Sequence, residues 1–327
     1  MVPAGEPVTG RGPPRRRRLA PTWRPSGLWP LLVLCSASLW ATMGLWAKAA
    51  YGLGVGPLEA ASARGTVAFL VLSVWALARP RRFAVTRADI PLLAGFGVVG
   101  IGVFYAAYLS ALDRLSVSVA AALLYTAPAF AVALGAVLLG ERVTFHKLTA
   151  LGGVLAGVLL VTGALGGGAG GVPARGVLLG LLAGLSYAAY TLFGRASRGR
   201  MDAVRALYWP TGIGAASLAL LAPPWRVLLD HPATLPAILG MAIVATLLPN
   251  LLFLIALGRL EAGVASIFAT LEPVMATLYG VVALEEALGA GQVVGVAAIA
   301  ASAAWLALSR SAPRPAAAAP TSSAARR

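Results

Sequence analysis

The chain has 327 residues, of which 59% are hydrophobic and 11% are charged, and its net charge is +15. This charged share is about half of that in soluble domains, so the composition indicates a membrane protein. The basic residues are distributed among loops instead of forming one patch, and therefore do not predict nucleic-acid binding. The sequence has no GxxxxGK[ST] loop, which argues against ATP-driven transport by this chain alone.

Residues 1–26 are rich in Pro and Arg, and this composition predicts a disordered basic tail. Five apolar runs follow at about residues 28–47, 58–78, 90–111, 116–139 and 145–163. Each run is close in length to the ~20 residues that an α-helix needs to cross a ~30 Å hydrocarbon core. The first run is longer than the apolar core of a signal peptide, so we expect a helix that the mature protein retains.

A Gly-rich stretch at 164–175 separates these runs from a second set. The second set lies at about residues 176–194, 203–222, 234–257, 261–284 and 289–308, and an Ala/Pro/Arg tail follows at 310–327. With the N-terminus inside, 21 of the 26 basic residues fall on the inner side and 4 on the outer side. This bias predicts that both termini lie in the cytoplasm and that the number of spans is even. For a prokaryotic source, the location would be the plasma (inner) membrane.

The two sets of runs contain an internal duplication. A shift of 145 positions places Arg114 on Arg259, Pro128 on Pro273 and Glu141 on Glu286, with no gap between these matches. Five spans in each half would start the second half on the opposite side of the membrane. We therefore predict an all-α membrane protein in which ten transmembrane helices form two inverted five-helix repeats, the architecture of secondary transporters.

The duplicated segments resemble a known family. The segments YLSALDRLSVSVAAALLYTAPAFAVALGAVLLGERV and LLFLIALGRLEAGVASIFATLEPVMATLYGVVALEE are similar to the two EamA domains of the drug/metabolite transporter superfamily. The first run adds LWATMGLWAKAA, which resembles the family pattern LWGSNFVAIK with Trp40 and Lys48 in register. Arg64 resembles a recurrent arginine of the family, whereas Ala41 stands where the family usually has glycine.

This resemblance implies a ten-helix carrier of small metabolites, often an exporter of amino acids or related compounds. It divides the chain into a first EamA-like repeat at 27–163 and a second at 176–309, joined by the linker at 164–175. It does not identify the substrate, the coupling ion or the direction of transport.

Two charged residues lie deep inside predicted spans. Glu272 is 11 residues into its run, about 16 Å deep, where a charged carboxylate costs ~2.5–3.5 kcal/mol. It is expected to gate the substrate or to titrate with a transported proton; the alternative is a packing role at a kinked helix. Arg64 lies about seven residues inside its span. It could bind a substrate carboxylate, or it could pair with Glu272 or Glu59.

Aromatic and amide side chains complete the set of cavity candidates. Tyr and Asn need hydrogen-bond partners when buried, and a wet cavity can supply them. The pairs Tyr105–Tyr108 and Tyr187–Tyr190 are each one helical turn apart and therefore share a face. The predicted substrate-binding residues are Trp40, Arg64, Tyr105, Tyr108, Tyr125, Tyr187, Tyr190, Asn250 and Glu272.

The repeated Pro and Glu residues have predicted structural roles. Pro128 and Pro273 each remove a hydrogen bond near mid-span, so they are expected to act as hinges, or else as static kinks. Glu141 and Glu286 end their spans, and we expect each to cap the N-terminus of the following helix.

These patterns favour a secondary transporter that works by alternating access on a small-molecule substrate within a lipid bilayer. No catalytic set, metal-ligand spacing or cofactor motif is evident, so we predict no enzyme activity, no metal and no cofactor. A nucleotide-sugar carrier, a membrane-embedded enzyme and a scaffold are the alternatives. Proton coupling and the choice between monomer and homodimer stay open.

Overall fold

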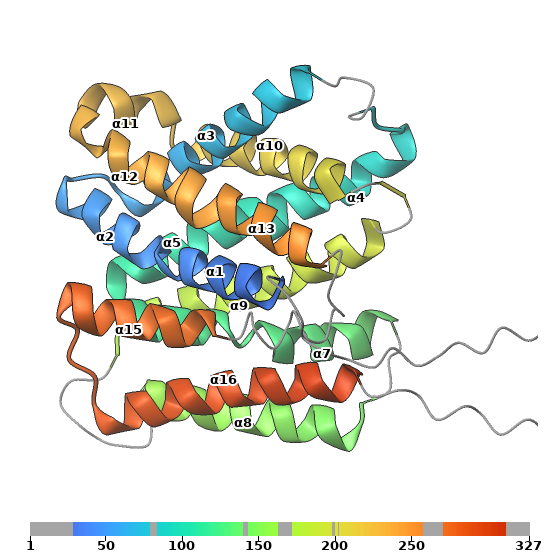
Figure 1. Ribbon diagram of the computed structural model, residues 1–327, viewed down its shortest axis with the longest axis vertical. Coiled ribbons are helices and arrows are strands. Elements are labelled where there is room, and N and C mark those ends of the chain that lie inside the picture. The colour runs from blue at the N-terminus through green and yellow to red at the C-terminus, as the bar shows by residue number, and fades with distance from the viewer. Residues whose placement is uncertain are drawn as a thin grey trace, which may run out of the picture.

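The computed structural model describes residues 29–78, 84–139, 143–162, 172–197, 200–201, 203–257 and 271–311. Every regular element in these ranges is a helix, as the composition predicts (Figure 1). The predicted linker falls largely, and both predicted tails almost wholly, outside the described residues, as does Glu141.

The first half of the chain forms the following elements: α1 (Trp29–Ala41), α2 (Met43–Gly52), α3 (Pro57–Leu77), η2 (Arg87–Asp89), α4 (Ile90–Gly95), η3 (Phe96–Val103), α5 (Phe104–Arg114), α6 (Val117–Leu124), α7 (Ala127–Leu139) and α8 (Phe145–Val161). The second half forms α9 (Ala174–Ser197), α10 (Ala203–Leu221), α11 (Pro224–Asp230), η4 (Pro232–Thr234), α12 (Leu235–Leu239), η5 (Gly240–Leu247), α13 (Leu248–Leu257), α15 (Glu272–Leu284) and α16 (Ala290–Ser311).

Each of the ten predicted runs contains at least one described helix. Six stretches are long and apolar enough to cross a membrane: Leu31–Gly52, Pro57–Leu77, Arg87–Arg114, Val117–Leu138, Ala174–Gly194 and Pro232–Phe253. Three shorter apolar helices lie at Phe145–Val161, Glu272–Leu284 and Ala290–Trp305. The chain is therefore a multi-span helical membrane protein, while the number of ten crossings stays a prediction.

The duplication extends to backbone geometry. In the first half, η2, α4, η3 and α5 follow one another without interruption, and η4, α12, η5 and α13 do the same in the second half. Both η3 and η5 are π-helices of eight residues, and their first residues, Phe96 and Gly240, are 144 positions apart. Because π-helices are rare and concentrate at functional sites, their recurrence in both halves is strong evidence for an internal repeat.

Small residues let α8 and α16 pack closely, and the two helices lie side by side in Figure 1. A Cβ added to Gly157 would lie 2.9 Å from the carbonyl oxygen of Gly295, and one added to Gly295 would lie 2.7 Å from the carbonyl oxygen of Gly157. The two backbones therefore meet where neither residue has a side chain, as in small-residue contacts between membrane helices.

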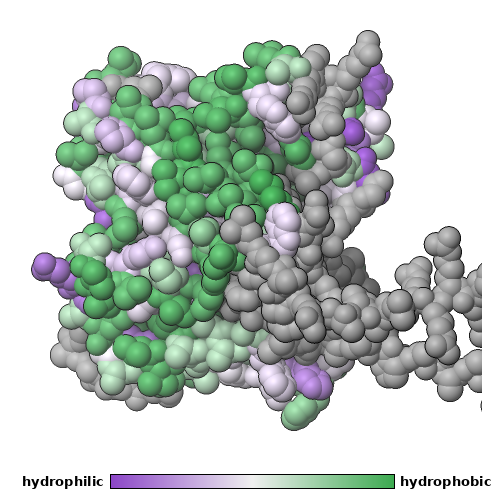
Figure 2. Space-filling view, viewed as in Figure 1, coloured by the Kyte–Doolittle hydropathy of each residue, from purple (hydrophilic) through white to green (hydrophobic). Residues whose placement is uncertain are grey.

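Large apolar side chains cover much of the outer surface. Val74, Leu77, Val137 and Leu220 are each more than 70% exposed, and green apolar patches dominate the middle of the face in Figure 2. Such a surface would be an aggregation hazard in water, whereas it is the expected contact with lipid tails.

The repeated prolines lie in the first turn of a helix. Pro128 is the second residue of α7, which starts after a break at Tyr125–Thr126, and Pro273 is the second residue of α15. Proline is well tolerated there because the first amides of a helix have no intrahelical acceptor. The sequence predicted a mid-span kink; in α6–α7 the structure has a full break just before the proline. Residues 258–270, which precede α15, lie outside the described part of the chain.

Candidate functional site

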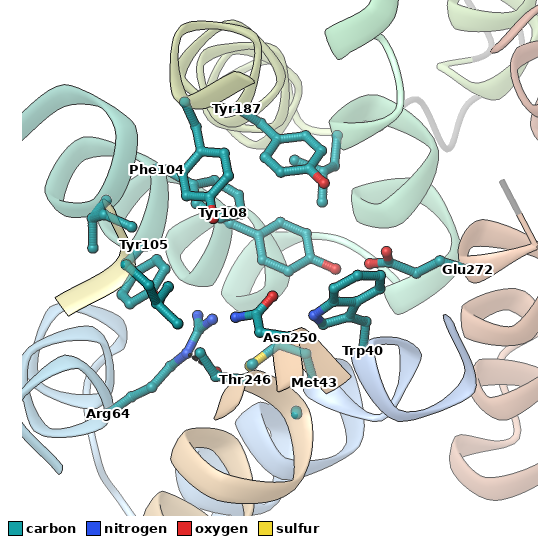
Figure 3. A pocket seen from close by; sticks show the side chains of 15 residues that line it. Trp40, Met43, Arg64, Phe104, Tyr105, Tyr108, Tyr187, Thr246, Asn250 and Glu272 are labelled. Atoms are coloured by element: carbon teal, nitrogen blue, oxygen red, sulfur yellow. Dashed lines mark hydrogen bonds between the residues drawn. The ribbon is translucent and has the colours of Figure 1, made fainter. Parts of the chain in front are cut away.

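A pocket with a cavity volume of about 80 Å³ lies among helices of both halves (Figure 3). Eight of the nine predicted cavity residues line it: Trp40, Arg64, Tyr105, Tyr108, Tyr187, Tyr190, Asn250 and Glu272. The other lining residues are Met43, Ile101, Phe104, Leu124, Leu207, Ala245 and Thr246. Tyr125 is outside this lining but contacts Glu272 directly. The cavity is larger than a single water molecule requires.

Arg64 forms the cationic wall of the pocket. It lies on α3, is only 5% exposed, and its Nε donates a hydrogen bond to Thr246 Oγ1 over 2.9 Å. Its guanidinium carbon lies 3.8 Å from the ring centroid of Tyr105, a cation–π contact. Its Nη1 is buried and has no hydrogen-bond partner among the described residues.

The partner of Arg64 comes from the π-helix η5. Thr246 donates its own hydroxyl hydrogen to the carbonyl oxygen of Met241, five residues earlier, over 2.7 Å. A hydroxyl has one hydrogen to donate and lone pairs to accept, so this bond orients the lone pairs of Thr246 toward Arg64. The wider turn of the π-helix thus positions an acceptor from the second half against a cation from the first half.

Glu272 forms the acidic wall. It is the first residue of α15, and its Oε2 accepts a hydrogen bond from the hydroxyl of Tyr125 over 2.9 Å. Tyr125 lies at the break between α6 and α7, so this bond joins corresponding spans of the two halves. In Figure 3 the carboxylate points into the pocket, on the side of Trp40 and Tyr108.

The two charges of the pocket are not neutralised by partners in the described part of the chain. The sequence left open a pair between Arg64 and either Glu272 or Glu59, and neither pair forms. Glu59 instead accepts a hydrogen bond from the Gly56 amide over 2.9 Å, as a cap of α3. An intramembrane charge without a counter-ion is costly, so Arg64 and Glu272 are the leading candidates for a functional role in this pocket.

Aromatic rings build one side of the pocket. Phe104 stacks on Tyr187 with ring centroids 5.3 Å apart, and Tyr187 stacks on Tyr190 at 5.8 Å. Phe104 also stacks on Tyr108 at 6.1 Å. These rings come from α5 and α9, so the two predicted Tyr pairs meet in one cluster, which gives the pocket an apolar wall with polar hydroxyl groups.

Glu286 has a capping role different from the expected one. Its carboxylate accepts hydrogen bonds from the amides of Val117 and Ser118 and from Ser118 Oγ, the last over 3.0 Å. It therefore caps the N-terminus of α6 in the first half, whereas capping of the following helix, α16, was expected. Helix order along the chain does not determine which N-terminus lies nearest, because that depends on how the halves pack. Nearby, Lys48 Nζ donates to the carbonyl oxygen of Leu115 over 3.0 Å.

Sequence reasoning missed Thr246, which contacts Arg64. A threonine inside an apolar run carries no distinctive signal, because its hydroxyl can bond its own helix backbone. Among the described residues, no group of three or more His, Cys, Asp or Glu side chains could hold a metal ion. The chemistry of the pocket is therefore that of its charges, hydroxyls and aromatic faces.

Comparison with known proteins gives a consistent result. The sequence model of the EamA-like transporter family matches residues 27–163 and 174–308. An uncharacterised transporter of Archaeoglobus fulgidus is 30% identical over 210 residues, which cover 62% of this chain and 73% of that protein. A solved crystal structure aligns with 87% of this chain and 99% of its own, with a TM-score of 0.57 and 23% identity, a likeness that shows the fold alone.

Proposed function

Because the chain belongs to the EamA-like transporter family, we propose that it is a secondary transporter of a small metabolite, an amino acid or a related compound, which it exports by alternating access. In this proposal the protein lies in the plasma membrane with both termini in the cytoplasm. The pocket lies within one chain, so the proposal holds for a monomer and for a homodimer alike.

The observation that carries this proposal is the composition of the pocket. Helices of both halves contribute to it, and it contains Arg64 and Glu272, neither of which has an oppositely charged partner in the described structure. A site at the interface of two repeats is accessible from either side when the repeats rock against each other. The described lining has one cationic residue, which favours a small carboxylate or zwitterion over a nucleotide-sugar diphosphate.

We propose further that Glu272 couples transport to protons. Among the described residues, its carboxylate accepts a hydrogen bond from Tyr125 and has no cation beside it. Intramembrane carboxylates of this kind serve as proton relays in transporters. Binding of a proton would remove the unpaired charge when the substrate is absent.

The test is transport by the full-length protein in liposomes. Uptake of radiolabelled amino acids and small metabolites is measured with and without an imposed pH gradient. Saturable uptake that increases with the gradient, and that loses this dependence in Glu272→Gln, is the expected result. Saturable uptake that does not depend on the gradient would contradict the proposal that Glu272 couples transport to protons. The absence of saturable uptake across the panel would contradict the transporter proposal.

The control is Glu285→Gln. Glu285 is an exposed neighbour of Glu286 at the end of α15 and lies outside the pocket. This variant should transport as the wild type does, so that a loss seen only in Glu272→Gln reflects the pocket and not a general effect of removing one negative charge.

A further inference from the structure

We infer that Arg64 Nη1 forms an anion subsite that binds the carboxylate group of the transported molecule, and that Thr246 is the positioning residue of this subsite. The inference rests on the proposed function and adds to it the group that recognises the substrate. Its starting point is the orphaned donor: Nη1 is buried, has no partner in the part of the chain that the structure describes, and belongs to a side chain that is 5% exposed.

The surroundings of Arg64 leave its Nη edge for a ligand. Thr246 occupies Nε, and Tyr105 covers a face of the guanidinium at 3.8 Å. A guanidinium donates in its own plane, so the aromatic ring satisfies the charge from one face without using an in-plane donor. Figure 3 shows the nitrogen end of Arg64 turned into the pocket, on the side of Asn250.

The missing partner is an oxygen anion. A buried donor without an acceptor carries a desolvation penalty, and a charged donor carries more than a neutral one. Arginine matches a carboxylate through parallel N–H···O bonds, which are short and charge-assisted. The described lining has no second cation that could help Arg64 to neutralise a dianionic phosphate, and Glu272 would repel such a phosphate. A carboxylate, with one negative charge, fits this balance.

Thr246 gives the subsite its geometry. Its hydroxyl is fixed by the bond to Met241 in the π-helix, and it holds Arg64 through Nε. The π-helix belongs to the second half and Arg64 to the first, so the subsite is complete only while the two halves are in contact here. Loss of the Thr246 hydroxyl should release the guanidinium while leaving its charge in the pocket.

The experiment measures binding to the purified full-length protein in detergent by ligand-induced thermal stabilisation. The probes are two matched pairs, L-leucine with L-leucinamide and L-phenylalanine with L-phenylalaninamide, which differ in the carboxylate alone. The wild type should bind at least one acid about 10- to 100-fold more tightly than its amide, the effect of a charge-assisted hydrogen bond.

The variants separate a ligand contact from a structural role. Arg64→Gln should abolish the preference for the acid, whereas Arg64→Lys, which keeps the charge without the planar fork, should keep part of it. Thr246→Val should reduce the preference and Thr246→Ser should restore it. Arg226→Gln, an exposed arginine on α11, is the matched control and should retain the full preference. If Arg64→Gln does not fold, the Arg64→Lys, Thr246→Val and Thr246→Ser variants still test the inference.

Three results would overturn the inference: equal affinity for acid and amide in the wild type, a preference that survives in Arg64→Gln, or no stabilisation by any carboxylate. Transport measured in liposomes separates this inference from the proposed function. If the protein binds acids more tightly than amides but transports neither, the transporter proposal is refuted and the anion subsite stands. If it transports acids and amides at equal rates, the anion subsite alone is refuted.

Discussion

The hydroxyl of Tyr125 donates to Glu272 Oε2 over 2.9 Å, and this bond connects the break between α6 and α7 to the first turn of α15. Tyr125 and Glu272 lie three residues before Pro128 and one residue before Pro273, respectively. The two duplicated prolines thus lie beside the two ends of one hydrogen bond, which makes this contact the junction of the repeated spans.

Tyr125→Phe should weaken this junction. Loss of a hydrogen bond to a carboxylate costs about 1.5–3 kcal/mol when the acceptor stays buried. The melting temperature of the purified protein should fall, and the pH at which transport is half-maximal should shift. Tyr279→Phe, on a half-buried tyrosine of α15 outside the pocket, is the control and should change neither quantity. An unchanged pH profile in Tyr125→Phe would separate this bond from proton coupling.

Glu286→Ala should destabilise the contact between the halves. The carboxylate caps the amides of Val117 and Ser118, and loss of a helix cap costs about 0.5–2 kcal/mol. Thermal unfolding should therefore start at a lower temperature. The neighbouring Glu285 has φ 54°, a left-handed conformation, and Glu285→Gly should be neutral or stabilising. Equal effects at both positions would argue against the cap.

Gly295→Val should disrupt the contact between α8 and α16. The added side chain would start 2.7 Å from the carbonyl oxygen of Gly157, and overpacking typically costs about 1–3 kcal/mol or more. Gly152→Ala on α8 meets nothing within 4 Å and should be tolerated. Thermal unfolding of both purified variants checks the difference. Similar melting temperatures would show that the contact between α8 and α16 can accommodate an added side chain.

The predicted orientation can be checked by cysteine labelling. The chain has one cysteine, Cys35, so Cys35→Ala provides a background without thiols. In intact cells, a membrane-impermeant maleimide should label Arg226→Cys, on α11, and should label Arg87→Cys, at the start of η2, only after permeabilisation. The opposite pattern would place both termini outside the cytoplasm, and labelling of both in intact cells would contradict the span order.

Much of the fold could be predicted because apolar runs of membrane length leave few alternatives. The pocket was predictable in part for a related reason: polar and aromatic residues are costly against lipid, so Arg64, Asn250 and Glu272 were expected to face a cavity, and the structure places all three in one pocket. Their function in substrate binding stays a prediction.

Other features have no signal in the sequence. The hydrogen bonds of the π-helices η3 and η5 span five residues where those of an α-helix span four, a difference that hydrophobic periodicity over eight residues does not resolve. Helix α11 has only seven residues and lies between the runs predicted at 203–222 and 234–257. The partner of Glu286 is set by long-range packing, which spacing along the chain does not encode.

The charges of the pocket are not duplicated, although the helices around them are. The residue 145 positions after Arg64 is Trp209, and the residue 145 positions before Glu272 is Ala127. In the predicted inverted repeat, a symmetrical lining would let a substrate bind in two equivalent poses related by a two-fold axis. With one cation on α3 and one carboxylate on α15, a zwitterion has a single favourable pose. If the repeats alternate as proposed, the substrate would keep one orientation throughout, and the two half-reactions of transport should then differ in rate and affinity.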